Sequence, residues 1–251
     1  SMRCNYSWKD GSKNMTRVVI TGMGWVTPLG NDLDSVWKRM CNSESAIATI
    51  DRFDASSFPT TFAGQVRDYD WKNFVKDASI HHEPAMNSQF ALGAAKQAWD
   101  QSGLGDCDTL NLERTGIYLG ASEGVLDFSA HSMIDTHSWD VEDGKVDAVA
   151  WAKFASGQLD EWGEVDQEPN MPLWHVAKEY GLRGPAFNCL TACAASTQAI
   201  GEAVSVLRAG DADVMLSGGA HTMLHALGIT GFNRLTALST FDGDPKKASK
   251  P

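Results

Sequence analysis

The sequence predicts an α/β domain in which helices cover both faces of a mostly parallel sheet. Two observations carry this prediction. Short apolar runs typical of buried strands alternate with longer segments of helical periodicity, and such alternation indicates parallel strands joined by helical crossovers. Glycine follows several of these runs, at the points where the chain would turn sharply. The expected strands are residues 17–21, 115–119, 186–190 and 214–216.

The clearest amphipathic helix is expected over residues 87–102, where an apolar stripe recurs at helical spacing. Gly103 then provides the left-handed residue that ends many helices. An earlier helix is expected after Asn31 and Asp32, either of which can cap its first turn. The apolar side of that earlier helix is expected to carry Leu33, Val36, Trp37 and Met40.

Residues 185–220 are expected to form a strand, a sharp turn, a helix, a tight turn and a second strand. The helix after Cys193 is rich in alanine, glycine and serine on nearly all sides. This predicts a helix that its neighbours pack closely, with no single wet face. Gly210 supplies its left-handed stop.

Cys193 lies where the expected strand ends and this helix begins. A helix N-terminus presents unpaired N–H groups and the positive end of the macrodipole. Such a position favours the thiolate, which is the form that attacks carbonyl carbons, and the N–H of Cys193 itself can hold a developing oxyanion. The alternative is a buried, inert cysteine, which is the interpretation that fits Cys189 on the strand itself.

Composition excludes several classes of function. The formal net charge of −11 is opposite in sign to the footprint that nucleic acid requires. No apolar run approaches the ~20 residues of a membrane-spanning helix, and no secretory signal is recognised. We therefore expect a cytoplasmic protein without a nucleic-acid or membrane partner. The five cysteines have an irregular spacing that fits neither a disulfide framework nor a paired metal site.

The loop from Gly22 to Gly30 invites comparison with a dinucleotide-binding loop, but it fails on detail. Thr27 replaces the third glycine of the G-x-G-x-x-G spacing, and Pro28 falls where the phosphate-binding helix should begin.

Loops at the carboxyl ends of parallel strands build binding sites. The loop from Gly22 to Gly30, residues 120–124 and Cys193 are therefore expected to share one pocket.

The segment Thr191-Ala-Cys-Ala-Ala-Ser196 resembles the nucleophile turn of the type II β-ketoacyl-acyl-carrier-protein synthases, condensing enzymes of the thiolase superfamily. The resemblance covers residues 15–251 in family order, apart from a divergent acidic insertion at about 125–168. Residues 1–14 are expected to be an expression leader or a disordered extension. The other matching segments are 17–24, 27–31, 50–54, 62–64, 180–185, 210–215, 231–232 and 237–240.

The resemblance implies the N-terminal half of a thiolase-like fold, and a homodimer joined through the edge strand that carries the nucleophile. It implies that Cys193 accepts an acyl group from the phosphopantetheine arm of an acyl-carrier protein. A malonyl-carrier then loses carbon dioxide, and the resulting carbanion attacks the acyl-Cys193 to elongate a fatty-acid or polyketide chain. No metal or dissociable cofactor is implied.

Two substrate-binding candidates also come from the resemblance. Glu123 matches an apolar position of the family's acyl pocket. An acid there indicates either a polar or differently gated substrate, or a side chain turned toward solvent. Phe232 matches a pocket aromatic, although a phenylalanine after Gly231 is also ordinary core.

The histidines of this chain are expected to be structural. His175 matches a family histidine that is not catalytic. His221 and His225 have the i, i+4 spacing of a helical metal pair, but they lack its glutamate and a third ligand. The run His81–Glu83 is expected at the surface.

The family's catalytic histidines and lysine lie beyond the segment that residues 237–240 match. The missing C-terminal half is therefore expected from a longer chain or a second polypeptide, and this chain alone is expected to be inactive in condensation. A non-catalytic assembly or binding subunit remains the alternative. The insertion is either a solvated lid or a partner-binding element, with one helix face formed by Trp151, Phe154, Ala155 and Leu159.

Overall fold

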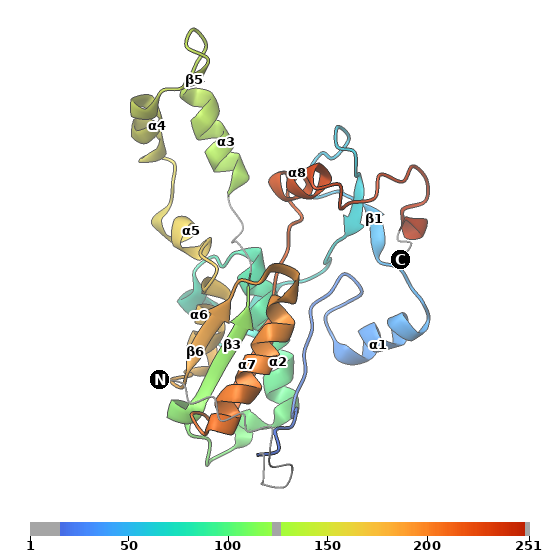
Figure 1. Cartoon of the computed structure of the whole chain (residues 1–251), viewed down its shortest axis with the longest axis vertical. Helices are drawn as coiled ribbons and strands as arrows, with labels where there is room; N and C mark the ends of the chain where they lie inside the picture. The colour runs from blue at the N-terminus through green and yellow to red at the C-terminus, as the bar shows by residue number, and fades with distance from the viewer. Residues whose placement is uncertain (1–15, 122–126, 249–251) are drawn as a thin grey trace, which may run out of the picture.

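A three-stranded parallel sheet forms the centre of the protein in the computed structural model, which describes residues 16–121 and 127–248 (Figure 1). The strands follow the order β6-β3-β7, which places β6 at one edge of the sheet. Ile117 of β3 lies opposite Ala186 of β6 and Leu216 of β7. Three of the predicted strands are thereby confirmed: β3 (Thr115–Gly120), β6 (Ala186–Cys189) and β7 (Val214–Gly219).

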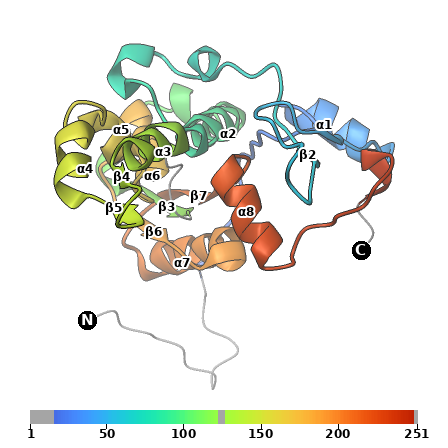
Figure 2. The ribbon, with the colours of Figure 1, turned by 90° about the horizontal axis from the view of Figure 1, so that it is seen from above.

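Helices cover both faces of this sheet, as the predicted fold class requires. One layer contains α2 (Met86–Ser102) and α6 (Met171–Tyr180), and the other contains α7 (Ala195–Ala209) (Figure 2). Gly103 and Gly210 adopt left-handed φ angles of 71° and 80° after α2 and α7. Both predicted helix stops are therefore confirmed.

The main core lies between the sheet and the layer of α2 and α6. Leu92, Ile117 and Val176 come from three different elements and are almost fully buried. Trp99 of α2 stacks on Tyr180 of α6, with ring centroids 4.3 Å apart. Burial of each large apolar side chain contributes about 1.5–3 kcal/mol. The apolar stripe predicted for residues 87–102 is the face of α2 that builds this core.

The prediction of close packing all around α7 is wrong. The buried side chains of α7 occupy one stripe that faces the sheet, whereas Ile200 outside this stripe is 46% exposed. A Cβ added to Gly201 would meet nothing within 4 Å. Small residues in the buried stripe let the helix approach the strands closely, and no element of the described chain covers its outer face. The stripe consists of Ala195, Ala199, Ala203 and Val206.

The predicted strand at residues 17–21 is also wrong, because these residues form no ladder in the described part of the chain. Val19 and Ile20 are 56% and 77% exposed. The segment instead leads into a loop held against α2, where Gln101 Oε1 accepts a hydrogen bond from the Met23 N–H at 2.7 Å. Strand formation requires a partner, and local β propensity alone does not supply one.

A smaller lobe packs beside the sheet. The helix expected after Asn31 is confirmed, because Asp32 caps it by accepting a hydrogen bond from the Ser35 N–H at 2.9 Å. Val36 is buried, but Trp37 and Met40 are exposed because no described element packs on that side. The lobe contains α1 (Leu33–Cys41), antiparallel β1 (Ile47–Thr49) and β2 (Phe62–Gly64), and α8 (Ala226–Arg234).

Residues 127–168, here called the arm, project beyond the carboxyl ends of the sheet strands (Figure 1). The predicted helix face is correct up to Ala155, where α4 ends; Leu159 lies outside the helix. Trp151 Nε1 donates to Asp135 Oδ1 at 2.7 Å and so ties α4 to α3. The arm comprises α3 (Phe128–His137), β4 (Trp139–Asp140), β5 (Lys145–Val146), α4 (Ala148–Ala155) and α5 (Glu161–Asp166).

Short 3-10 turns complete the described chain. They are η1 (Trp71–Phe74), η2 (Ala78–His81), η3 (Leu104–Asp106), η4 (Leu112–Arg114), η5 (Ala192–Ala194) and η6 (Pro245–Lys247). None of the helices in the described residues is long and apolar enough to cross a membrane.

Replacement of Gly120 by alanine should disrupt the packing of β3 on α7. A Cβ at this position would lie 2.4 Å from the Ala195 carbonyl carbon, and backbone atoms cannot move aside cheaply. We expect Gly120→Ala to lower the free energy of unfolding by about 2 kcal/mol. The matched control is Gly201→Ala, which fills open space in a helix and should raise it by about 0.5–1 kcal/mol. Urea unfolding monitored by circular dichroism measures the free energy of unfolding of both variants. Equal changes in Gly120→Ala and Gly201→Ala would contradict the close contact at Gly120.

Candidate active site

Cys193 occupies the junction between β6 and α7, as the sequence predicted. Strand β6 ends at Cys189, and Cys193 is the middle residue of the 3-10 turn η5, two residues before the first residue of α7. The Cys193 residue is exposed, whereas Cys189 is buried at 8% exposure. The two cysteines therefore have the different environments that were expected of an accessible thiol and a core residue.

The turn that presents Cys193 is strained. Ala192 has a φ of +50°, in the left-handed region that residues with a Cβ rarely adopt. Two contacts hold the turn. The Thr191 hydroxyl donates to Gln198 Oε1 at 2.7 Å, and the Ala194 N–H donates to the Thr191 carbonyl at 3.1 Å. Backbone strain of this kind persists only where surrounding contacts enforce it, and it is common at functional sites.

Glycines at the strand ends bring the sheet against this turn. Gly120 of β3 touches the backbone of Ala195 and Ser196, and a Cβ at Gly219 of β7 would lie 2.9 Å from the Ser196 Cβ. The Cys189 thiol also donates to the Ala195 carbonyl at 3.3 Å. The start of α7 is thus fixed at the carboxyl edge of the sheet.

The first turn of α7 keeps its N–H groups free of side-chain caps. The residue at the N-cap position is Ala194, which has no side chain able to accept a hydrogen bond. Uncapped N–H groups at a helix start stabilise negative charge. An exposed thiol beside such groups is equipped to attack a carbonyl carbon while an N–H holds the oxygen.

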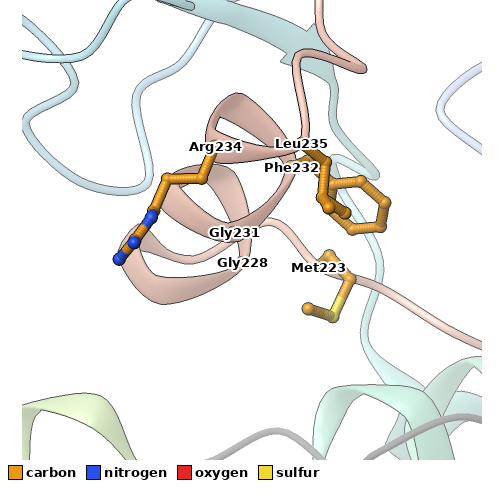
Figure 3. Close-up of a pocket in the computed structure, with 6 residues that line it drawn as sticks. All are labelled: Met223, Gly228, Gly231, Phe232, Arg234 and Leu235. Carbon is orange, nitrogen blue, oxygen red and sulfur yellow. The ribbon is translucent and has the colours of Figure 1, made fainter.

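Phe232 lines a cavity of about 380 Å³ on α8 (Figure 3). The cavity is mostly apolar, with Arg234 as its charged member, and Cys193 is not among the residues that line it. The role of Phe232 in substrate binding stays a prediction, as does the single pocket expected between the loops and Cys193. Glu123, the other substrate-binding candidate, lies outside the described residues. The cavity is lined by Met223, Gly228, Gly231, Phe232, Arg234 and Leu235.

His221 and His225 do not form a helical metal-binding motif, because His225 is the N-cap of α8 and accepts a hydrogen bond from the Gly228 N–H at 3.2 Å. The prediction that His81 lies at the surface is wrong. His81 is 1% exposed and contacts His175, although its neighbours His82 and Glu83 are exposed. Among the described residues, no cluster of histidine, cysteine and acidic side chains is suited to a metal ion.

A family model described as the N-terminal domain of β-ketoacyl synthases matches residues 15–251. The chain belongs to this family. The match confirms the resemblance inferred from the nucleophile turn and its flanking segments.

Curated relatives agree with this assignment. The chain is 35% identical over 237 residues to 3-oxoacyl-(acyl-carrier-protein) synthase 2 of Coxiella burnetii. This alignment covers 94% of this chain and 53% of that relative. It is 32% identical to the chloroplastic 3-oxoacyl-(acyl-carrier-protein) synthase I of Arabidopsis thaliana, covering 94% of this chain and 47% of the plant protein. This β-ketoacyl synthase chain therefore spans about half the length of the curated relatives it matches.

Solved structures confirm the thiolase-like fold. A β-ketoacyl synthase from Burkholderia phymatum superposes with a TM-score of 0.75 at 24% identity, covering 93% of this chain and 53% of that one. A type II polyketide ketosynthase, solved in complex with its acyl-carrier protein, superposes with a TM-score of 0.68 at 24% identity. The superposition covers 91% of this chain and 50% of the ketosynthase chain. At these identities the likeness concerns the fold.

Relief of the strain at Ala192 should stabilise the protein. A residue with a Cβ pays about 1–2 kcal/mol in the left-handed region, and glycine avoids most of this cost. We expect Ala192→Gly to raise the free energy of unfolding by about 0.5 kcal/mol after the entropy that glycine loses on folding. Ala152→Gly, at an exposed position inside α4, should instead lower it by about 1 kcal/mol. If both variants were destabilised equally in urea, the turn would not be strained.

Proposed function

We propose that this chain is the nucleophile-bearing half of a chain-elongating β-ketoacyl synthase and that Cys193 accepts the acyl group. The observation that carries the proposal is the exposed Cys193 on a strained turn at the uncapped start of α7. Family membership and the curated relatives support the reaction class. The C-terminal half, which would supply the remaining catalytic groups, is part of the proposal.

The chemistry assigned to Cys193 is acyl transfer followed by carbon–carbon bond formation. The thiolate attacks the carbonyl carbon of a carrier thioester, and the Cys193 N–H holds the oxyanion. The carrier thiolate leaves and takes up a proton, so that the acyl group is bound to Cys193. A malonyl-carrier then releases carbon dioxide, and its α-carbon attacks the acyl carbonyl and expels the Cys193 thiolate. No step uses a metal or redox cofactor.

An acyl-carrier protein with a phosphopantetheine-linked chain is the proposed partner. A related ketosynthase has been solved in complex with its own carrier protein, which supports this choice. The net charge of −11 opposes docking of an acidic carrier. Docking would therefore use the basic side chains of Arg234, Lys246 and Lys247, together with groups of the other half.

A homodimer joined through β6 belongs to the same proposal. β6 is an edge strand of the described sheet, and an edge presents unpaired N–H and C=O groups that favour strand pairing. Phe187 and Leu190 at this edge are 45% and 54% exposed. The proposed organisation comprises an expression leader or a disordered extension at 1–14, the synthase half at 15–251 and its divergent acidic insertion at about 125–168, in a cytoplasmic protein. These last assignments rest on the sequence expectations alone.

Acyl labelling tests the role of Cys193. After incubation with an acyl thioester, intact-mass analysis should find one added acyl group in the wild-type chain and none in Cys193→Ala. The matched control is Cys107→Ala, because a hydrogen bond with Thr109 lowers the pKa of the exposed Cys107 thiol and makes it the competing nucleophile. Acylation that disappears in Cys107→Ala but persists in Cys193→Ala would contradict the proposal.

Condensation should require the other half. We expect the 251-residue chain to form no ketoacyl product from acyl- and malonyl-carriers, because the resemblance assigns the histidines and lysine that promote decarboxylation to the proposed other half. Product analysis by mass spectrometry checks this expectation. Ketoacyl formation by the isolated chain would overturn it, whereas acylation of Cys193 without condensation is the expected pattern. An unreactive Cys193 in a folded dimer would favour the non-catalytic assembly subunit.

A further inference from the structure

Thr191 is an exception among the residues that precede the 3-10 turns of the described chain. A short polar side chain at this position normally accepts a hydrogen bond from the N–H two residues further on. Thr191, which precedes η5, makes no such bond within the described residues. Gly103 precedes η3 and has no side chain to make one. The bond is present at the four remaining turns η1, η2, η4 and η6, where the accepting residues are Asp70, Asp77, Asn111 and Asp244.

Threonine makes this bond elsewhere in the same chain. The Thr27 hydroxyl accepts from the Leu29 N–H at 3.1 Å, and the Thr222 hydroxyl accepts from the Leu224 N–H at 3.3 Å. The corresponding donor for Thr191 is the N–H of Cys193, two residues further on. The residue type therefore does not explain why the Thr191 side chain leaves this N–H uncapped.

Gln198 binds the Thr191 hydroxyl instead. The hydroxyl donates to Gln198 Oε1 at 2.7 Å, and this bond joins the residue before η5 to the first turn of α7. An amide oxygen accepts hydrogen bonds and donates none, so the contact fixes the direction of the hydroxyl hydrogen. Its length is the usual one for an O–H···O hydrogen bond. Gln198 is therefore a partner that competes with the Cys193 N–H for the Thr191 side chain.

The backbone of the turn is consistent with this competition. Thr191 has a ψ of 36°, whereas the residues that cap the four other 3-10 turns are extended, with ψ between 103° and 114°. Ala192 follows with its left-handed φ of +50°. Capping of a 3-10 turn in the described chain thus accompanies an extended backbone, and the bond to Gln198 accompanies a different one.

The N–H that the missing cap would occupy belongs to the proposed nucleophile. The Ala194 N–H already donates to the Thr191 carbonyl at 3.1 Å, and the Ala195 N–H donates to the Ala192 carbonyl. The Cys193 N–H is the group assigned to the oxyanion of acyl transfer. A donor that is bonded to a side-chain oxygen must give up that bond before it stabilises an oxyanion, and this raises the barrier to the reaction.

We propose that Gln198 is a positioning residue that keeps the Cys193 N–H open to the oxyanion by holding the Thr191 hydroxyl away from it. The inference rests on the proposed acyl transfer, and it adds the means by which the turn keeps its oxyanion donor available. Without Gln198, the Thr191 hydroxyl would cap the Cys193 N–H in the way that Thr27 and Thr222 cap theirs. The thiol would remain, but the donor beside it would be occupied.

Acylation kinetics test this role. Cys193 is acylated with the octanoyl thioester of N-acetylcysteamine, and peptide mass spectrometry follows the label with time. We expect Gln198→Ala to lower the maximal rate about fivefold, which corresponds to about 1 kcal/mol for one neutral hydrogen bond. The half-saturating thioester concentration should not change, because the oxyanion forms only as the reaction proceeds. Ser205→Ala, at an exposed position further along α7, is the matched control and should react as the wild type does.

Removal of the hydroxyl distinguishes this role from a merely structural one. Thr191→Val keeps the branched shape of the side chain but has no oxygen, so it cannot cap the Cys193 N–H. A double variant with Gln198→Ala and Thr191→Val should therefore react about fivefold faster than Gln198→Ala alone. If the Thr191–Gln198 bond only supported the turn, the double variant would react as slowly as Gln198→Ala. That result, or a wild-type rate in Gln198→Ala, would overturn the inference.

Hydrogen exchange provides a readout that does not use acylation. In ¹⁵N-labelled chains, NMR should show that the Cys193 N–H exchanges about fivefold more slowly in Gln198→Ala than in the wild type, and that the double variant restores the wild-type rate. Equal exchange in the wild type and Gln198→Ala would refute the role of Gln198 even where Cys193 is acylated. A wild-type chain that shows the expected exchange but is not acylated would contradict the proposed function alone.

Discussion

The contact between the strand ends and the start of α7 fixes the position of the turn that carries Cys193. Gly120 and Gly219 carry no side chains, so the sheet reaches the backbone of Ala195 and Ser196 directly. This leaves the chain between β6 and α7 too little room for a relaxed connection, and Ala192 adopts a left-handed conformation. The exposed Cys193 lies on this turn, between the edge strand β6 and the start of α7.

Local sequence patterns predicted those elements whose partners are near or whose periodicity is strong. The helix at 87–102 and the strands around 115–119 and 214–216 follow from apolar spacing and glycine stops. Residues 17–21 have equal strand propensity but no ladder in the described chain. The outer face of α7 was mispredicted for a related reason, because small residues indicate close approach without saying on how many sides it occurs.

The same distinction between adjacent and distant partners applies to the residues of the candidate site. Cys193 was predictable because its position depends on a strand and a helix that adjoin it in sequence. The burial of His81 was not, because it depends on His175, which is 94 residues away. Nothing in the run His81–Glu83 distinguishes its first residue from two exposed neighbours. The hydrogen bond of Thr191 to Gln198 was missed too, although Gln198 lies in the first turn of the predicted helix, close to Thr191 in sequence.

The open edge of β7 and the unpaired residues 17–21 have a practical consequence for handling this chain. β7 has no neighbour on its far side within the described residues, and Ile20 is 77% exposed. Open backbone groups together with apolar side chains are a template for strand addition between molecules. Concentrated solutions of the isolated chain are therefore prone to self-association, and a short extended peptide supplied in trans would compete with that aggregation.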